Sequence, residues 1–344
     1  MRSRFLVKLG LSAATVFMLM ALAICGYSAD KQTIRLASEY PDKHPTIKNG
    51  VFPWIDEVSE KTDGNLKIQF FNPNTLAPVK EANAALMSGA ADMIFTPSQM
   101  SARGKFPVSS VALLPFMNKT AESGSRMVWE LYVKDPEMQN EFADMMVLWQ
   151  WVSAPFEVHT TKKDIQTLED IQGLKLIVWT GDLARMVSAL GANPVETTPH
   201  DTYLSLQRGM ADGVVCPIAP MKAYKISDVT KYHIILGLMT THFYAGVNLD
   251  KWNSLPADMQ QVLVDTAGLK MVEVSGKTLD AGAAKDTEWM KEKGHKFTVL
   301  SEEERAKWQA KTEPIVDEWI KKMEGQGFSN ARQIVEDAYA ISAK

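Results

Sequence analysis

Hydrophobic positions along the chain follow two different periods. Short runs that are rich in β-branched residues, or apolar at every second position, predict strands. The clearest of these strands are at 33–37, 66–70, 92–95, 147–151, 175–178 and 213–216. Between them apolar residues recur at helical spacing and predict helices at 47–61, 80–87, 183–190 and 202–208. This alternation predicts an α/β fold with mostly parallel sheets.

A long helical pattern occupies 257–294, a stretch without proline. An unbroken helix there, at about 1.5 Å per residue, could reach across two small domains. We therefore predict a two-lobed fold like that of periplasmic binding proteins, with hinge strands and a long spanning helix. We assign 30–152 plus about 242–290 to lobe I, and 153–241 plus about 291–344 to lobe II, with the ligand cleft between them.

The first 29 residues have the pattern of a secretory signal peptide. Basic residues at Arg2, Arg4 and Lys8 precede an apolar stretch, and small residues follow it before the first acid, Asp30. A membrane anchor would need about 20 apolar residues, and this stretch is shorter. Lipid anchoring at Cys25 is a minor alternative, because Leu-Ala-Ile-Cys loosely resembles a lipobox. In either case we predict a periplasmic protein.

Charge and cysteine content narrow the possible partners. Without residues 1–29 the chain has 34 basic and 41 acidic residues, a net charge near −7. Nucleic-acid binding needs a basic surface, so we predict no nucleic-acid partner. Cys216 is the only cysteine outside the predicted signal peptide, so the exported chain cannot form an intrachain disulfide and must depend on its core.

Motifs that would indicate an enzyme are missing from the sequence. It has no G-x-G-x-x-G, P-loop, H-E-x-x-H or G-x-S-x-G motif. The six histidines do not show metal-ligand spacing, so we predict no metal and no cofactor. Cys216 with His200 or His242 as its base could form a nucleophile, but a lone buried thiol is usually inert. We predict that the protein is not an enzyme.

Eight short motifs follow one another in an order that is found in one family. They are LASE with HP (36–45), VSEKTDG (58–64), LMSGAADM (86–93), LPF (114–116), GLK (173–175), LGANPV (190–195), LQRGMADG (206–213) and WNSLP (252–256). With these motifs the chain resembles the DctP-type substrate-binding proteins of tripartite ATP-independent periplasmic (TRAP) transporters, over about 33–339. The resemblance implies a monomeric receptor that closes on a small organic solute and delivers it to TRAP membrane permease subunits.

The resemblance also implies a carboxylate ligand, which the family holds with an arginine directly after the Gly-Leu-Lys-hydrophobic tetrad. In this chain Ile177 occupies that position. A second family arginine, twenty positions earlier, is matched by Glu157, and an asparagine after the Asp-Gly pair is matched by Cys216. Two potential cations are thus replaced by an apolar residue and an anion.

Aromatic residues surround these substitutions, with Trp149 and Trp151 before Glu157 and Trp179 after Ile177. Aromatic faces beside a carboxylate favour a cation, so our main prediction is a small amine or another nitrogenous solute. Trp149 and Trp151 would face the same side of one strand, so that both are in the core or both line the cleft. Further predicted ligand contacts are Glu39, Ser98 and Phe243.

Other functions remain open from the sequence. The protein could bind an organic acid or an aromatic amino acid through Arg103 or Arg185, with the tryptophans stacking on the ligand. Minor alternatives are an exported enzyme that uses Cys216 and a sensor subunit that signals to a partner instead of feeding a permease.

Overall fold

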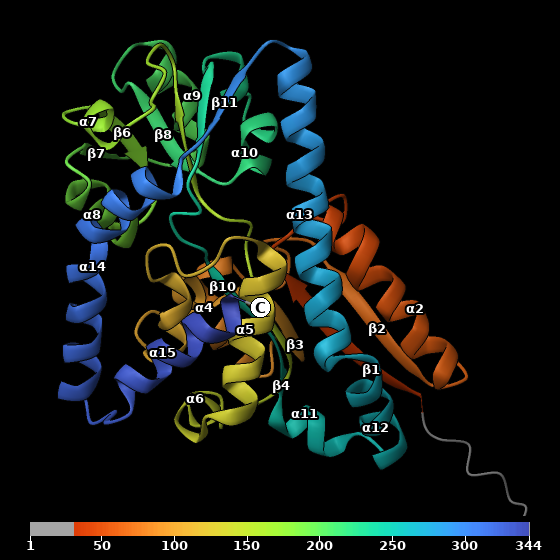
Figure 1. Ribbon diagram of the computed structural model, residues 1–344. Coiled ribbons are helices and arrows are strands. Elements are labelled where there is room, and N and C mark those ends of the chain that lie inside the picture. Colours follow the sequence, from red (N-terminus) through yellow and green to blue (C-terminus); the bar gives the residue numbers. More distant parts are fainter. Residues whose placement is uncertain (1–30, 344) are drawn as a thin grey trace, which may run out of the picture.

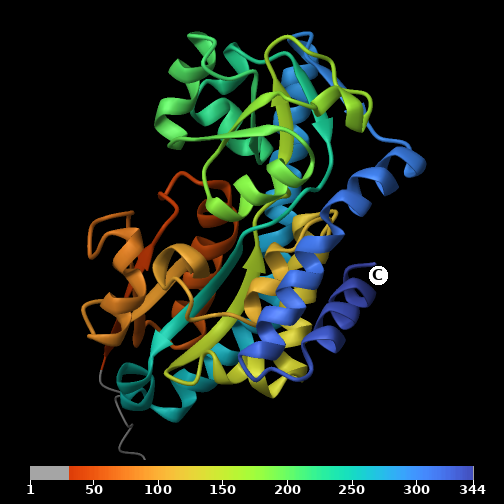
Figure 2. The ribbon, with the colours of Figure 1, turned by 90° about the vertical axis from the view of Figure 1, so that its left-hand side faces the viewer.

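The computed structural model describes residues 31–343, so the predicted signal peptide and Cys25 lie outside the described residues. Two β-sheets form the centres of two lobes that lie one above the other (Figures 1 and 2). The lobe I sheet has the order β2 (Leu66–Phe71), β1 (Gln32–Ser38), β3 (Met93–Pro97), β10 (His242–Asn248), β4 (Met145–Val152). The lobe II sheet has the order β11 (Lys296–Val299), β9 (Tyr232–Ile235), β5 (Glu157–Thr160), β8 (Gly213–Cys216), β6 (Lys175–Val178), β7 (Asn193–Glu196).

Each sheet is parallel except for one strand. In lobe I, β10 runs antiparallel to both neighbours, and in lobe II β5 does the same. The mostly parallel, two-lobed α/β fold predicted from the sequence is therefore confirmed. All six predicted strands are present within two residues of their expected ends.

Helices cover the faces of both sheets. Lobe I carries a π-helical turn (Ile47–Val51) that continues into α2 (Phe52–Lys61), and then η3 (Val79–Glu81), α3 (Ala82–Met87), α4 (Ser98–Ser101), η4 (Ser109–Leu113), α5 (Ala121–Lys134), α6 (Pro136–Asn140), α11 (Leu249–Ser254) and α12 (Ala257–Thr266). Lobe II carries α7 (Leu168–Ile171), α8 (Gly181–Ala189), α9 (Pro199–Gln207), α10 (Ile218–Ala223) and η5 (Ile226–Asp228).

Two short segments, 153–156 and 236–241, connect the sheets (Figure 2). They run side by side, because Ser153 N donates to Thr241 O at 2.9 Å and Phe156 N donates to Met239 O at 2.9 Å. We call these paired segments the hinge. Since β4 leads directly into β5 and β9 directly into β10, the carboxyl ends of the parallel strands in both sheets face the hinge region. In open α/β sheets ligands bind at this edge.

The predicted spanning helix is present but interrupted. The sequence predicted one helix through 257–294, whereas the structure has α12, a break at Ala267 and then α13 (Gly268–Glu292). Gly268 has a φ of +53°, a left-handed conformation that glycine adopts without strain and that interrupts the helix. The 25 residues of α13 extend from α5 and β4 in lobe I to α10 in lobe II (Figure 1).

The C-terminal helices divide between the lobes. Helix α14 (Glu302–Gly325) packs on α7 and α8 of lobe II, whereas α15 (Ala331–Ser342) packs on α5 and η4 of lobe I. The side chain of Ser342 donates to Asn118 Oδ1 at 2.8 Å and ties this end to lobe I. The sequence assigned 291–344 to lobe II, which is wrong for α15 because its apolar face is buried against α5.

Candidate functional site

The lobe I edge that faces the hinge carries a group of aromatic rings. Phe243, at the start of β10, lies 5.2 Å from Trp151 and 5.5 Å from Tyr40, measured between ring centroids. Tyr40 in turn stacks on His44 at 3.8 Å. Trp151 and Phe243 are buried, whereas Tyr40 and His44 are partly exposed. Tyr40 and His44 are thus the rings of this group that are accessible to a ligand.

Trp149 and Trp151 face the same side of β4, as the strand period predicted. Both are wholly buried in the lobe I core, where Trp149 packs against Trp54 at 5.1 Å and Trp151 against Phe95 at 4.0 Å. Of the two alternatives left open by the sequence, the structure supports core packing. The Nε1 atom of Trp151 is nevertheless shielded and has no hydrogen-bond partner among the described residues.

Ser98 is also buried and holds α4 to the sheet. Its hydroxyl lies 3.0 Å from His242 Nδ1, and His242 Nε2 lies 2.9 Å from Gln150 Oε1. Because the amide oxygen of Gln150 can only accept, His242 is protonated on Nε2 and its Nδ1 accepts from Ser98. Burial lowers the pKa of His242 to about 3, so this chain of hydrogen bonds is neutral.

Glu157 begins β5 and binds the main chain of the hinge. Its Oε2 accepts the N–H of Leu236, and that of Gly237 at 3.0 Å. Burial raises the pKa of Glu157 to about 7, although these two hydrogen bonds and the charge of Arg305 oppose the rise. The residue is only 5% exposed, so most of its carboxylate is shielded inside the protein, with both hydrogen bonds on Oε2.

Arg305, on α14, contacts the hinge, and the sequence did not indicate this contact. Its Nη1 donates to Leu236 O at 2.6 Å, and its guanidinium lies 5.2 Å from the centre of the Phe116 ring. Phe116 N donates to Leu238 O at 2.9 Å. The hinge segment 236–238 is therefore held from both lobes, by Glu157 and Arg305 of lobe II and by Phe116 of lobe I.

The remaining lobe II positions predicted as ligand contacts belong mostly to a core cluster. Ile177 and Cys216 are fully buried together with Val214. Trp179 is partly exposed and donates from Nε1 to Thr202 Oγ1 at 3.0 Å. Where the resemblance implied two arginines and an asparagine, this protein thus has one residue that binds the hinge and two core residues.

The two arginines proposed as anion contacts occupy different environments. Arg185 lines a hollow of about 360 Å³ to which both lobes contribute, with Gln99 from lobe I and Asp182 from lobe II. It pairs with Glu318 of α14 at 2.5 Å, and both side chains are more than half exposed, at 56% and 63%. Arg103 is exposed in the turn after α4 and does not line this hollow.

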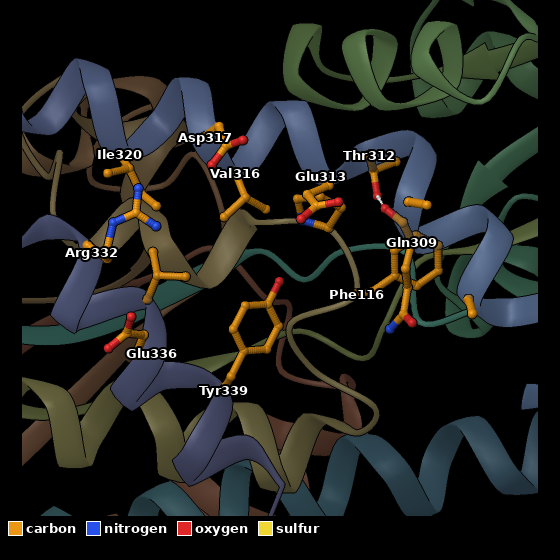
Figure 3. A pocket seen from close by; sticks show the side chains of 14 residues that line it. Phe116, Gln309, Thr312, Glu313, Val316, Asp317, Ile320, Arg332, Glu336 and Tyr339 are labelled. Carbon is orange, nitrogen blue, oxygen red and sulfur yellow. Dashed lines mark hydrogen bonds between the residues drawn. The ribbon is translucent and has the colours of Figure 1, made fainter.

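A second hollow, of about 510 Å³, lies between α14 and α15 and contains none of the predicted contacts. Figure 3 shows Tyr339 pointing from α15 toward α14 in this hollow, with Glu313 and Asp317 on the opposite side.

Within residues 31–343 no group of three or more His, Cys, Asp or Glu is arranged to hold a metal ion. In the same range no helix has the length and apolar character needed to cross a membrane.

Three histidines that are scattered in the sequence form a hydrogen-bonded chain in lobe II. His159 Nε2 lies 3.0 Å from Cys216 O, His159 Nδ1 lies 2.8 Å from His233 Nδ1, and His233 Nε2 lies 2.8 Å from His295 Nδ1. A carbonyl can only accept, so His159 donates from Nε2, His233 donates from Nδ1 to His159, and His295 donates from Nδ1 to His233. Burial lowers the pKa of His159 to about 4 and that of His233 to about 2.

Comparisons with known proteins agree with this architecture. Residues 36–322 match the family model "Bacterial extracellular solute-binding protein, family 7" (DctP). The C4-dicarboxylate-binding periplasmic protein DctP of Rhodobacter capsulatus is 27% identical over 78% of this chain and 81% of its own length.

Two solved structures of TRAP solute-binding proteins are similar over nearly their full lengths. One, from Rhodoferax ferrireducens with copurified benzoate, has a TM-score of 0.80 and 26% identity and covers 90% of this chain and 97% of its own. The other, from a marine metagenome with 3-hydroxybenzoate, has a TM-score of 0.81 and 25% identity and covers 91% of this chain and 98% of its own. These relatives are solute-binding proteins and not enzymes. The chain belongs to family 7 of the bacterial extracellular solute-binding proteins, the DctP-type solute receptors of TRAP transporters.

Proposed function

We propose that this receptor captures an organic acid, with an aromatic carboxylate as the first candidate, and delivers it to TRAP membrane permease subunits. The observation that carries the proposal is the use of the Glu157 carboxylate by the N–H groups of Leu236 and Gly237. Glu157 is 5% exposed, has a raised pKa and holds two main-chain N–H groups of the hinge, so it is a poor anionic partner for an ammonium group.

Glu39, the second anion of the amine prediction, is also a poor partner for a cation. Burial raises its pKa to about 8, so an ammonium group at neutral pH has to bind against the cost of ionising it. The buried positions of Trp149 and Trp151 further remove the aromatic faces that were expected to attract it. The benzoate and 3-hydroxybenzoate of the two relatives therefore support the organic-acid alternative over the amine.

Tyr40 and His44, the partly exposed rings of the group, give the lobe I edge an aromatic surface that suits a ring-bearing solute. Offset or edge-to-face ring pairs contribute about 0.5–1.5 kcal/mol beyond the burial of their area. From lobe II, Arg185 is the candidate anion contact, because an ion pair as exposed as Arg185–Glu318 is worth little and can exchange partners. Arg185→Gln tests this contact, and Arg103→Gln serves as its matched control.

A ligand screen tests the class of solute. We expect benzoate, 3-hydroxybenzoate and other small acids to raise the melting temperature of the purified protein by mass action, and benzylamine and choline to leave it unchanged. Calorimetric titration of each acid that raises it gives the affinity. A protein that is stabilised by the amines and by none of the acids would show that the organic-acid proposal is wrong.

The cellular setting is part of the same proposal. We infer that residues 1–29 are removed on export, that the mature receptor is a periplasmic monomer, and that it acts without a cofactor. Mass spectrometry of the exported protein locates its first residue, and light scattering on the purified protein measures its mass in solution. Turnover of a bound acid, or a dimer at micromolar concentration, would contradict this description.

A further inference from the structure

Glu39 lies in the first loop of lobe I, directly after the carboxyl end of β1. Its main-chain N–H donates to Phe95 O at 2.9 Å, which fixes the residue at the sheet edge that faces the hinge. Its side chain is partly exposed, but Oε2 is shielded from solvent and has no hydrogen-bond partner among the described residues. A shielded polar atom without a partner is uncommon in a native protein and suggests that a ligand supplies the partner.

Tyr40 and His44, which lie in the same loop as Glu39, carry no positive charge at neutral pH. Tyr40 is the direct neighbour of Glu39, and burial, together with Glu39, raises the pKa of the Tyr40 hydroxyl well above its ordinary value. His44 stacks on Tyr40, and burial lowers its pKa to about 4. Burial alone accounts for the rise of the Glu39 pKa to about 8, because no neighbouring charge contributes to it. All three groups are therefore uncharged at pH 7.

We propose that Glu39 binds the solute as a neutral carboxyl group, which donates its O–H to a carboxylate oxygen of the solute. This inference rests on the proposed function, because it requires an organic acid as the ligand. At pH 7 Glu39 brings the proton and the solute brings the negative charge, so the pair shares one proton and carries one charge in a single O–H···O hydrogen bond. Lobe I then contacts the solute through a neutral hydrogen-bond donor, in a site without the arginines that the resemblance implied.

If Glu39 makes this contact, the affinity for the solute should depend on pH, whereas a contact with arginine would give no such dependence. A guanidinium remains charged throughout the accessible range, so affinity for an acid would be flat in alkaline solution. Glu39 ionises above pH 8, and its carboxylate then repels that of the solute. We expect the affinity for benzoate to fall on the order of tenfold for each pH unit above that point.

Calorimetric titration of benzoate between pH 6 and pH 10 tests the inference with three variants and the wild type. Glu39→Gln keeps an N–H donor, so its affinity is expected to stay near the wild-type value at pH 7 and to remain flat at higher pH. Glu39→Met keeps the length but removes the donor, and should bind about 10- to 100-fold more weakly at pH 7. Asp42→Asn, in the same loop with an exposed side chain, is the matched control and should keep the wild-type profile.

Infrared difference spectra of wild type minus Glu39→Gln, recorded without ligand, give a second measurement. They should show the band of a protonated carboxyl group at pH 7 that disappears by pH 10. If benzoate binds the wild type with a flat profile, or binds Glu39→Met as tightly as the wild type, the Glu39 inference is wrong while the proposed function stands. If the infrared band is present and no acid in the screen binds, the proposed function is wrong, and the Glu39 contact with a carboxylate is wrong with it.

Discussion

The Oε2 atom of Glu157 and the main-chain nitrogen of Gly237 are 3.0 Å apart, so an acidic side chain holds the segment that returns from lobe II to lobe I. The resemblance to the family implied an arginine at this position. Glu157 instead stabilises the hinge, together with Arg305, which binds the carbonyl of Leu236. The position therefore has a structural role in this protein as well as a different charge.

Two substitutions of Glu157 distinguish its role as a hydrogen-bond acceptor from the effect of its charge. Glu157→Leu leaves two buried N–H groups without a partner and should lower the free energy of unfolding by about 2–4 kcal/mol. Glu157→Gln keeps an acceptor oxygen and should change it by less than about 1 kcal/mol at pH 8, where the wild-type group is ionised. Urea denaturation measures both. An equal loss in the two variants would show that the charge, and not the acceptor, is what the hinge needs.

The histidine chain should make the protein sensitive to acid. The pKa values of His159 and His233, about 4 and about 2, lie below the ordinary value of 6.5, so the folded state favours the neutral rings. The unfolded chain takes up protons first, and stability is lost as the pH falls below 6.5 toward the folded-state values. Each histidine contributes a slope of about 1.4 kcal/mol per pH unit in that window.

Denaturation at several pH values between 4 and 7 checks this slope. His233→Gln removes one titrating ring and should reduce the slope by about 1.4 kcal/mol per pH unit. His200→Gln, on the exposed face of α9 and outside the histidine chain, is the control for the substitution itself. A His233→Gln protein with the wild-type slope would show that the folded state does not hold His233 neutral in this pH range.

Helix α13 offers two glycines with opposite expected effects. A Cβ atom at Gly276 would lie 2.5 Å from the Cα of Glu122 at the start of α5, so Gly276→Ala should destabilise the protein by at least about 2 kcal/mol. At Gly282 a Cβ atom meets nothing within 4 Å, and Gly282→Ala should stabilise the helix by about 0.5–1 kcal/mol. Calorimetric melting of the pair measures both changes. Two shifts of the same sign would mean that α13 and α5 are not packed this closely.

The thiol of Cys216 should be inert while the protein is folded. It is fully buried, and burial raises its pKa well above the ordinary value, with a further rise from the charge of Glu157. Because only the thiolate reacts, a water-soluble thiol reagent should label the folded mature chain negligibly and label it fully in denaturant. Ser188→Cys, on the exposed face of α8, should react at once in the folded protein. Rapid labelling of Cys216 in the native state would support the alternative that the protein is an exported enzyme that uses Cys216.

The sequence predicted the parts of the fold that depend on local patterns. Runs with a period of two gave the strands, and the order of eight short motifs indicated the family. The roles of Glu157 and the histidines were not predictable in this way, because they depend on partners brought together by sheet register. His159 lies beside His233 only because β5 pairs with β9, and Glu157 reaches Leu236 only because the same pairing continues into the hinge. The break in the spanning helix depends on the conformation of a single glycine.

The division of the C-terminal helices has a practical consequence for measuring lobe movement. Strand β1 begins the described chain in lobe I, and α15 returns the other end to the same lobe. Fluorophores attached at the two ends would therefore move together and report no change of distance when the lobes open or close. A distance sensor for this receptor needs one label on lobe II, for example on the exposed surface of α9.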